Sequence, residues 1–373
     1  MWRTIHNKGE KDRMRPPTLP QKLQITVLWI STLTGFAVQA AARGPYVIED
    51  LGALPAGSSL VNGINAFAEV VGSSGAPHGT DTHAFYWNGR ERMRDLGTLP
   101  LGENSSAFAI NNLGEVVGYS NRATDIRAFR WTRRDGRHEI APVPGFNSSF
   151  ALGINDGGQV AGYCSGAKGI QAVVWNRNAV AQSLGKLPGG SFSQAFGINN
   201  VGQIVGVADS SDGNRAFLWT KESGMVNLGI LPGDNSSRAL RINNVGQVVG
   251  TSSGPTGKHA FLWSSSGGMQ YLGTLPGGEY SEALDVNDAG IVVGTSGTSL
   301  GARAFIWTSS GGFRDLNSLI PSDSNLVLTS AQGINNRGQI VAIGSPRHDL
   351  QIDHMMHGDD EFHAGPTHIY LLY

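Results

Sequence analysis

Seven polar side chains stand at one repeated position of this sequence, each directly before a short apolar run. Arginine and histidine there could receive an acidic sugar or a phosphate, because both donate hydrogen bonds to charged oxygens. They could instead bond the carbonyls or acids of neighbouring turns, such as Glu103, Asp234 and Glu279, because turn backbone removed from water needs partners. The predicted ligand-binding residues are His83, Arg127, Gln171, Arg215, His259, Arg303 and His368.

A second group of reactive side chains lies in a polar stretch at 347–365. Its histidine nitrogens and carboxylates could bind Zn²⁺ or another transition metal, and its acids alone could bind Ca²⁺. The spacing matches no standard metal motif, so a solvated loop is the alternative interpretation. We expect no other cofactor. The candidate metal ligands are Asp353, His354, His357, Asp359 and His363.

The remaining reactive groups form no catalytic constellation in the sequence. Cys164 is the only cysteine, so no intrachain disulfide can form, and nothing near it indicates a nucleophile. We expect a small buried or half-buried thiol there. Glycine-rich turns such as 187–190 precede no helix pattern and therefore do not predict a phosphate-binding loop.

The elements that position these residues follow from an internal repeat. Tryptophan recurs at an interval of 44 residues, each time at the end of an apolar run. A fixed period of this length is typical of an array whose units bury their apolar surface against one another. We therefore expect these rings in the core between units, although a row of tryptophans can also form a carbohydrate platform. They are Trp87, Trp131, Trp175, Trp219, Trp263 and Trp307.

Each unit contains four short strand patterns with glycine-rich turns between them. In one unit these patterns are 239–243, 247–251, 259–263 and 269–272. Seven units, counted by the proline of a recurring turn, predict an all-β, seven-bladed β-propeller of four-stranded blades. An open solenoid is the alternative, and it should carry polar capping units. The prolines are Pro55, Pro100, Pro144, Pro188, Pro232, Pro276 and Pro321.

The two ends of the array complement each other. Residues 46–51 match a fourth strand, and residues 367–373 match a third strand. We therefore predict that 46–51 completes the last blade as its outermost strand and closes the ring. The first strand of each unit carries small residues such as Ala195 and Gly197, which suit a crowded axis, so we place it innermost. The Leu-Pro-Gly turns and the seven donors then share one face, here called the upper face.

Residues 1–42 differ in composition from the repeat region at 43–373. Basic residues precede an apolar run at 23–38 and small residues follow it, which is typical of a secretory signal peptide. The run is short for a membrane span of about 20 apolar residues, so we expect cleavage and no span in the mature chain. An amphipathic tail is the alternative. The expected location is secreted or periplasmic, where the protein could associate with the cell surface.

The charge balance excludes one class of partner. The leader contains six basic and two acidic residues, so its removal changes the net charge from −1 to about −5. An acidic body argues against nucleic-acid binding, which needs a basic patch. We expect a monomer whose partner is a polysaccharide or a protein.

The repeat resembles the HAF-repeat family of bacterial extracellular proteins. The His-Ala-Phe run stands at 83–85 and 259–261, and the motifs Asp-Leu-Gly-x-Leu-Pro-Gly-Gly and Ile-Asn-Asn-x-Gly-Gln-Val-Val-Gly match from Tyr46 onward. The resemblance implies an exported bacterial protein of unknown biochemical role, and it brings no catalytic residues. The sequence departs from the pattern at 138–142, at 171–175 and throughout the last unit.

Two functions agree with this pattern. The first is an exported propeller that acts as a binding or structural module at the bacterial cell surface or in the periplasm. The alternative is an exported propeller hydrolase or lyase that acts on a polysaccharide or a similar envelope polymer. A catalytic site requires one unit to deviate with a tuned acid, base or nucleophile, whereas repeated similar rims favour binding. We therefore expect a binding protein.

Overall fold

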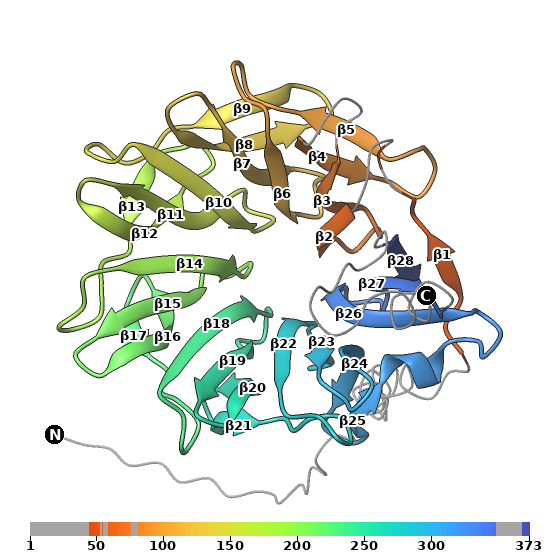
Figure 1. The fold of residues 1–373 in the computed structure, drawn as a ribbon. Helices are drawn as coiled ribbons and strands as arrows, with labels where there is room; N and C mark the ends of the chain where they lie inside the picture. Colours follow the sequence, from red (N-terminus) through yellow and green to blue (C-terminus); the bar gives the residue numbers. More distant parts are fainter. Residues whose placement is uncertain (1–44, 53, 55–58, 76–80, 348–367) are drawn as a thin grey trace, which may run out of the picture. The chain divides into compact units, whose positions relative to one another are not determined.

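The computed structural model describes residues 45–52, 54, 59–75, 81–347 and 368–373. These residues form seven four-stranded antiparallel sheets arranged in a ring, as Figure 1 shows. The predicted seven-bladed β-propeller is therefore confirmed.

Blades 1 to 6 are meanders in which consecutive strands pair, and the first strand of each blade lies nearest the middle of the ring (Figure 1). Blades 1 to 7 follow one another along the chain. Their inner strands are β2 (Ser59–Ile64), β6 (Ser105–Ile110), β10 (Ser148–Ile154), β14 (Ser193–Ile198), β18 (Ser236–Ile242), β22 (Ser281–Val286) and β26 (Leu326–Ile334). Their second strands are β3 (Val70–Gly75), β7 (Val116–Asn121), β11 (Val160–Gly166), β15 (Ile204–Ser210), β19 (Val248–Gly254), β23 (Val292–Ser296) and β27 (Ile340–Pro346).

The outer half of each blade contains the third and fourth strands. The third strands are β4 (Thr82–Trp87), β8 (Ile126–Thr132), β12 (Gly169–Trp175), β16 (Gly213–Thr220), β20 (Gly257–Ser264), β24 (Arg303–Thr308) and β28 (His368–Leu372). The fourth strands are β5 (Arg94–Gly97), β9 (Gly136–Ile140), β13 (Ala181–Ser183), β17 (Gly224–Asn227), β21 (Gly268–Tyr271), β25 (Gly312–Asp315) and β1 (Ile48–Asp50). A single 3₁₀ turn, η2 (Leu316–Leu319), follows β25 within the described residues.

The last blade is completed by the first described strand. β1 pairs antiparallel with β28, and Ile48 lies opposite Leu372. Val47 and Tyr373 extend the pairing, because each donates its backbone N–H to the carbonyl of the other at 3.0 and 3.1 Å. The prediction that 46–51 closes the ring as the outermost strand of blade 7 is confirmed. Closure covers the outer edge of β28, which would otherwise stay unpaired.

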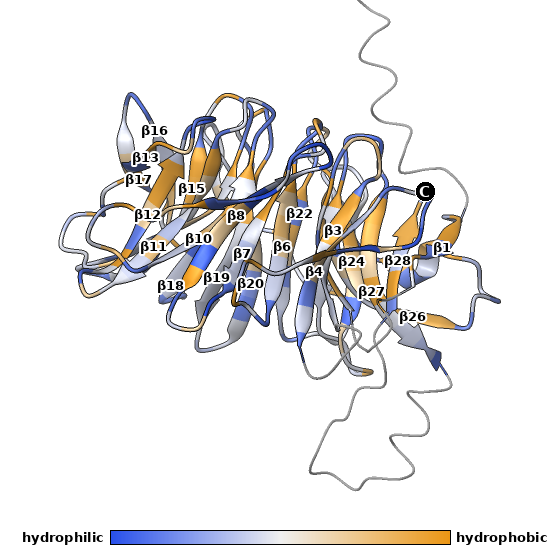
Figure 2. Cartoon of the chain, turned by 90° about the horizontal axis from the view of Figure 1, so that it is seen from above, coloured by the Kyte–Doolittle hydropathy of each residue, from blue (hydrophilic) through white to orange (hydrophobic). Residues whose placement is uncertain are grey.

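Apolar side chains fill the spaces between adjacent blades. Hydrophobic residues gather along the strands and hydrophilic residues at many of the turns (Figure 2). Trp175 is fully buried and packs against Val117 and Ala128 of the preceding blade. Trp87 and Trp131 are 6% and 4% exposed. The tryptophan series therefore forms core, as predicted, and each buried large side chain stabilises the fold by about 1.5–3 kcal/mol.

A glycine in the second strand of six blades is required by close backbone approach. A Cβ atom on Gly206 would lie 1.9 Å from the carbonyl oxygen of Gln194 on the inner strand. Blade 7 carries Ala342 at this position, and its inner strand has an additional register shift between Leu328 and Ser330. The shift lies directly before the residues that face Ile343 and Ala342. The glycines are Gly72, Gly118, Gly162, Gly206, Gly250 and Gly294.

A circle of side-chain hydrogen bonds runs around the lower face, where the Asn-Asn-x-Gly turns lie. In each blade a buried asparagine donates from Nδ2 to the backbone carbonyl of the equivalent asparagine in the next blade, at 2.9–3.2 Å. The same side chain also binds its own turn, so each turn is anchored to its neighbour. This asparagine circle contains Asn65, Asn111, Asn155, Asn199, Asn243, Asn287 and Asn335.

Candidate functional site

The seven predicted ligand-binding residues lie on third strands near the upper face, and all are half-buried. Four of them bond a side chain on the fourth strand of their own blade, and Arg127, described below, is one of these. His83 Nδ1 lies 2.9 Å from Asp95 Oδ2, and His368 Nδ1 lies 3.1 Å from Asp50 Oδ2. Gln171 donates to a serine hydroxyl on β13. These contacts tie the third strand to the outer strand.

The other donors bond nearby turns. His259 Nδ1 lies 2.9 Å from Asp234 Oδ1, in the turn that precedes blade 5. Arg215 donates to the backbone carbonyl of Asn235 at 2.9 Å, and Arg303 donates to the carbonyl of the residue before it. The described contacts hold each donor to its own blade or to the next turn, and they do not bring the seven together.

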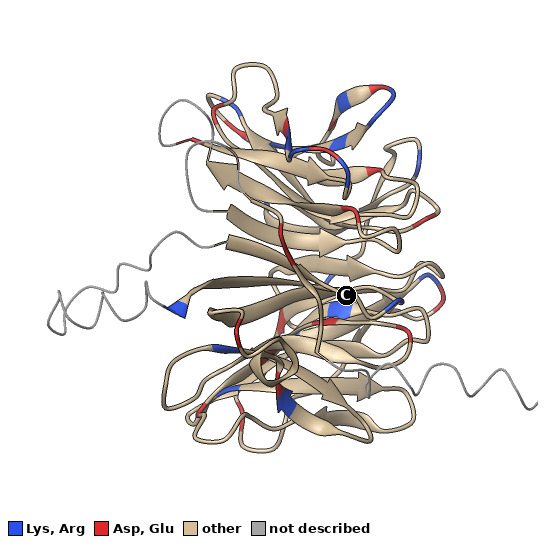
Figure 3. Ribbon diagram, turned by 90° about the vertical axis from the view of Figure 1, so that its right-hand side faces the viewer, with Lys and Arg blue, Asp and Glu red and all other residues tan. Residues whose placement is uncertain are grey.

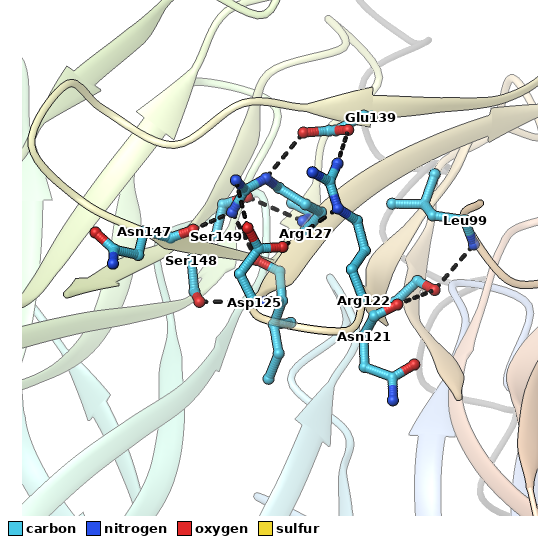
Figure 4. A network of polar contacts seen from close by, with 12 residues as sticks. Leu99, Asn121, Arg122, Asp125, Arg127, Glu139, Asn147, Ser148 and Ser149 are labelled. Atoms are coloured by element: carbon cyan, nitrogen blue, oxygen red, sulfur yellow. Dashed lines mark hydrogen bonds and ion pairs between the residues drawn. The ribbon is translucent and has the colours of Figure 1, made fainter. Parts of the chain in front are cut away.

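Arg127 has the most partners of the seven. Its guanidinium lies 2.7 Å from Asp125 and 2.9 Å from Glu139, and it donates to the carbonyl of Asn147 at the start of blade 3 (Figure 4). Arg122 joins the same two acids, at 3.3 Å and 2.7 Å. Glu139 belongs to β9, where the sequence departs from the repeat. Two cations and two acids therefore form a charge-balanced network that links blades 2 and 3.

Charged residues lie mainly at turns and strand ends, with few along the strand centres (Figure 3). Two inner strands are exceptions, because Arg241 on β18 and Asp285 on β22 occupy a position that is small in every other blade. Burial raises the pKa of Asp285, and the positive charge of Arg241 opposes the shift. The carboxylate accepts backbone N–H groups from Val286 and Ile334, both at 2.9 Å. The equivalent small residues are Gly63, Ala109, Gly153, Gly197 and Gly333.

Four aromatic rings of blades 2 and 3 form a continuous series, here called the aromatic strip. The centroid of Tyr119 lies 5.4 Å from that of Phe108, on which it stacks, and 5.3 Å from that of Phe150, which it meets edge-on. Phe150 in turn stacks on Tyr163 at 4.4 Å. All four residues are half-buried. The hydroxyls of Tyr119 and Tyr163 bond no other group in the described part of the chain.

The strip comes from inner and second strands, not from the third strands that carry the predicted ligand-binding residues. Phe108 and Phe150 lie on β6 and β10, and Tyr119 and Tyr163 lie on β7 and β11. Burial raises the pKa of Tyr163, so its hydroxyl stays protonated and can donate at neutral pH. Other blades carry a smaller side chain at the position of the two tyrosines. This departure from the repeat is the sequence signal that could have identified the strip. The residues equivalent to the two tyrosines in the other blades are Ser73, Val207, Thr251, Thr295 and Ile343.

A separate pocket of about 490 Å³ lies between blades 3 and 4, beside the lower-face turns. Trp219, Lys221 and the amides of Gln159 and Gln203 are in its wall. The two glutamines are already bonded to members of the asparagine circle. This pocket therefore belongs to the seam that holds the two blades together.

Some predictions fall outside the described residues. The signal peptide at 1–42 and the metal ligands Asp353, His354, His357, Asp359 and His363 are among them. In the part of the chain that is described, no three His, Cys, Asp or Glu side chains come together as metal ligands. None of its helices is long and apolar enough to span a membrane.

No family model matches the sequence, and no curated protein matches it. Solved structures are similar in fold. A streptogramin B lyase structure matches with a TM-score of 0.53 at 11% identity, over 88% of this chain and 98% of that chain. Virginiamycin B lyase from Staphylococcus aureus matches with a TM-score of 0.52 at 12% identity, over 88% and 99%. At these identities the similarity shows the propeller fold alone.

Proposed function

We propose that this propeller is an exported binding module that takes a polysaccharide on the aromatic strip. The strip is the observation that carries the proposal. Sugar rings present flat C–H faces, which the negative faces of aromatic rings attract, and hydroxyl edges, which the free hydroxyls of Tyr119 and Tyr163 can bond. Ligand sites commonly combine aromatic walls with a few placed polar groups.

The strip differs from the tryptophan series in two ways that favour binding. Its rings are half-buried, whereas Trp131 and Trp175 are almost completely covered by neighbouring blades. It also occurs in only two blades, so the architecture that repeats seven times does not require it. Export is supported by the composition of residues 1–42 and by the resemblance to HAF-repeat proteins.

Titration of the protein with soluble envelope polysaccharides, followed by calorimetry, tests the proposal. Phe150→Ala and Tyr163→Ala each remove one stacking ring, and we expect affinity to fall about three- to tenfold, because an aromatic contact contributes about 0.5–1.5 kcal/mol. Phe313→Ala is the matched control, since Phe313 is also half-buried and stacks on Phe305 at 4.0 Å outside the strip. Equal weakening by the control, or undiminished affinity in both strip variants, would contradict the proposal.

A second candidate function is cleavage of the same polymer. The observation that favours it is the pair Arg241 and Asp285, which breaks the repeat, because a carboxyl group with a raised pKa can act as a general acid. Incubation of the polysaccharide with wild-type protein should then produce shorter chains, and Asp285→Asn should prevent it. Intact polymer after incubation with the wild type would leave binding as the function.

A further inference from the structure

Arg241 is a long cation at a position where the inner strands have almost no room. At the equivalent Gly197, an added Cβ would lie 3.1 Å from the carbonyl oxygen of Leu240 on the next inner strand. The side chain of Arg241 instead reaches Asn62, whose backbone oxygen lies 3.4 Å from one guanidinium nitrogen. Asn62 belongs to blade 1 and Arg241 to blade 5, so these blades are not neighbours. The guanidinium therefore extends across the interior of the ring.

No carboxylate forms an ion pair with this guanidinium within the described residues. Its two hydrogen bonds go to backbone carbonyls, those of Leu240 and Asn62, although a guanidinium has five N–H donors. Arg238, three residues earlier on the same strand, is in contrast paired with Glu282 at 3.2 Å. A half-buried guanidinium without a paired anion attracts one from solution, because its charge is only partly compensated.

The chemistry around Arg241 favours a carboxylate as that anion. A guanidinium matches the two oxygens of a carboxylate or a phosphate in a bidentate arrangement. Burial raises the pKa of Asp285 and the positive charge of Arg241 lowers it, while the oxygens of Asp285 accept the N–H groups of Val286 and Ile334. Whenever Asp285 is ionised, it repels a doubly charged phosphate more strongly than a singly charged carboxylate.

Asn62 connects Arg241 to the aromatic strip. Its backbone oxygen accepts from Arg241, and its side-chain amide donates to the carbonyl of Ala107 at 2.8 Å. Ala107 immediately precedes Phe108, the first ring of the strip. Through Asn62, the cation is therefore connected to the backbone beside the first ring of the strip.

We propose that Arg241 binds a carboxylate group of the polysaccharide, so that the polymer is one of uronic acids. This inference rests on the proposed function, since the strip would hold the sugar faces while Arg241 holds the acid. The probes are a hexasaccharide of galacturonic acid and the same hexasaccharide with its carboxyl groups reduced to alcohols. Wild-type protein should bind the acidic chain about tenfold or more tightly, because a charge-assisted hydrogen bond contributes about 1.5–3 kcal/mol.

Arg241→Gln should remove the preference for the acidic chain and leave binding of the reduced chain unchanged. Arg238→Gln is the matched control, because its guanidinium is already paired with Glu282, and it should keep the preference. Arg241→Lys keeps the positive charge but loses the bidentate donor arrangement of the guanidinium, so an intermediate preference for the acidic chain is expected. If Arg241→Gln does not fold, Arg241→Lys provides the test. If the folded Arg241 variants keep the full preference for the acidic chain, the inference is overturned and the proposed function stays intact. Equal affinity of the wild type for both chains would have the same consequence. Absence of wild-type binding to either chain, and to every polysaccharide tested, would overturn both.

Discussion

Asn335 donates a hydrogen bond from its side-chain amide to the backbone carbonyl of Asn65 at 3.0 Å, although 270 residues separate the two. This bond joins blade 7 to blade 1 and completes the asparagine circle. The pairing of β1 with β28 closes the ring at its periphery. The propeller is therefore closed twice, by backbone pairing on the outside and by buried amides near its lower face.

The asparagine circle should contribute strongly to stability. Asn199→Ala removes donors to the carbonyl of Asn243 and to Gln203, and it removes the acceptor of the Gln203 N–H. We expect a loss of about 2–3 kcal/mol in the free energy of unfolding, because buried partners are left unpaired. Urea denaturation measures it. Asn200→Ala is the control, since Asn200 is exposed and its loss should cost about 0.5 kcal/mol; equal losses would count against this account.

One backbone hydrogen bond of the outer closure can be tested by itself. Val47→Pro removes the N–H that donates to the carbonyl of Tyr373, at a residue whose exposed fraction is 53%. We expect a loss of about 1–2 kcal/mol in the free energy of unfolding. Val47→Ala keeps the N–H and should change stability by less than about 0.5 kcal/mol. If thermal unfolding shows the two variants to be alike, this hydrogen bond contributes little to stability.

Cys164 replaces a serine that anchors the upper-face turn in other blades. Its sulfur accepts the backbone N–H of Val143 at 3.5 Å, whereas the hydroxyl of Ser120 accepts that of Leu99 at 2.9 Å. Cys164→Ser should therefore stay within about 1 kcal/mol of the wild type. Cys164→Val leaves the Val143 N–H without its acceptor and should cost about 1–3 kcal/mol. Chemical denaturation of both variants checks this, and a serine variant as unstable as the valine variant would contradict it.

Burial raises the pKa of the Cys164 thiol to about 11. The unfolded thiol titrates near 9, so the folded state holds its proton over the interval between the two values. Stability from this group is complete below pH 9 and is lost as pH rises toward 11. Relative to Cys164→Ser, the wild type should lose on the order of 2 kcal/mol across that range. The difference in unfolding free energy, measured at several pH values, tests the sign, and a constant difference would refute it.

For the seven polar donors, the sequence predicted the strand position of each side chain but not its hydrogen-bond partner. The 44-residue period places His83 and His259 at equivalent sites, and both lie on third strands as expected. Their partners differ, because His83 contacts Asp95 on the fourth strand while His259 contacts Asp234 in a turn. Single residues outside the shared motif decide each contact, and the repeat does not specify them.

The buried thiol and the tryptophan core could be predicted for a physical reason. An apolar run that recurs once per unit must be covered by the next unit, since a single four-stranded sheet cannot bury both of its faces. Trp175 and Cys164 are accordingly fully buried. The aromatic strip could not be predicted, because Tyr119 and Tyr163 are single departures from the repeat. Their rings form a series with Phe150 only when blades 2 and 3 pack side by side.

The sequence by itself determined the number of blades, the order of their strands and the closure of the ring, because period, turn chemistry and strand pattern are local properties that repeat. Only the tertiary structure decided which side chains meet across the ring. Arg241 contacts Asn62 over a separation of 179 residues, and the Asn335 amide finds its acceptor only when the seventh blade returns to the first. Such contacts depend on the curvature accumulated over all blades, which no single repeat encodes.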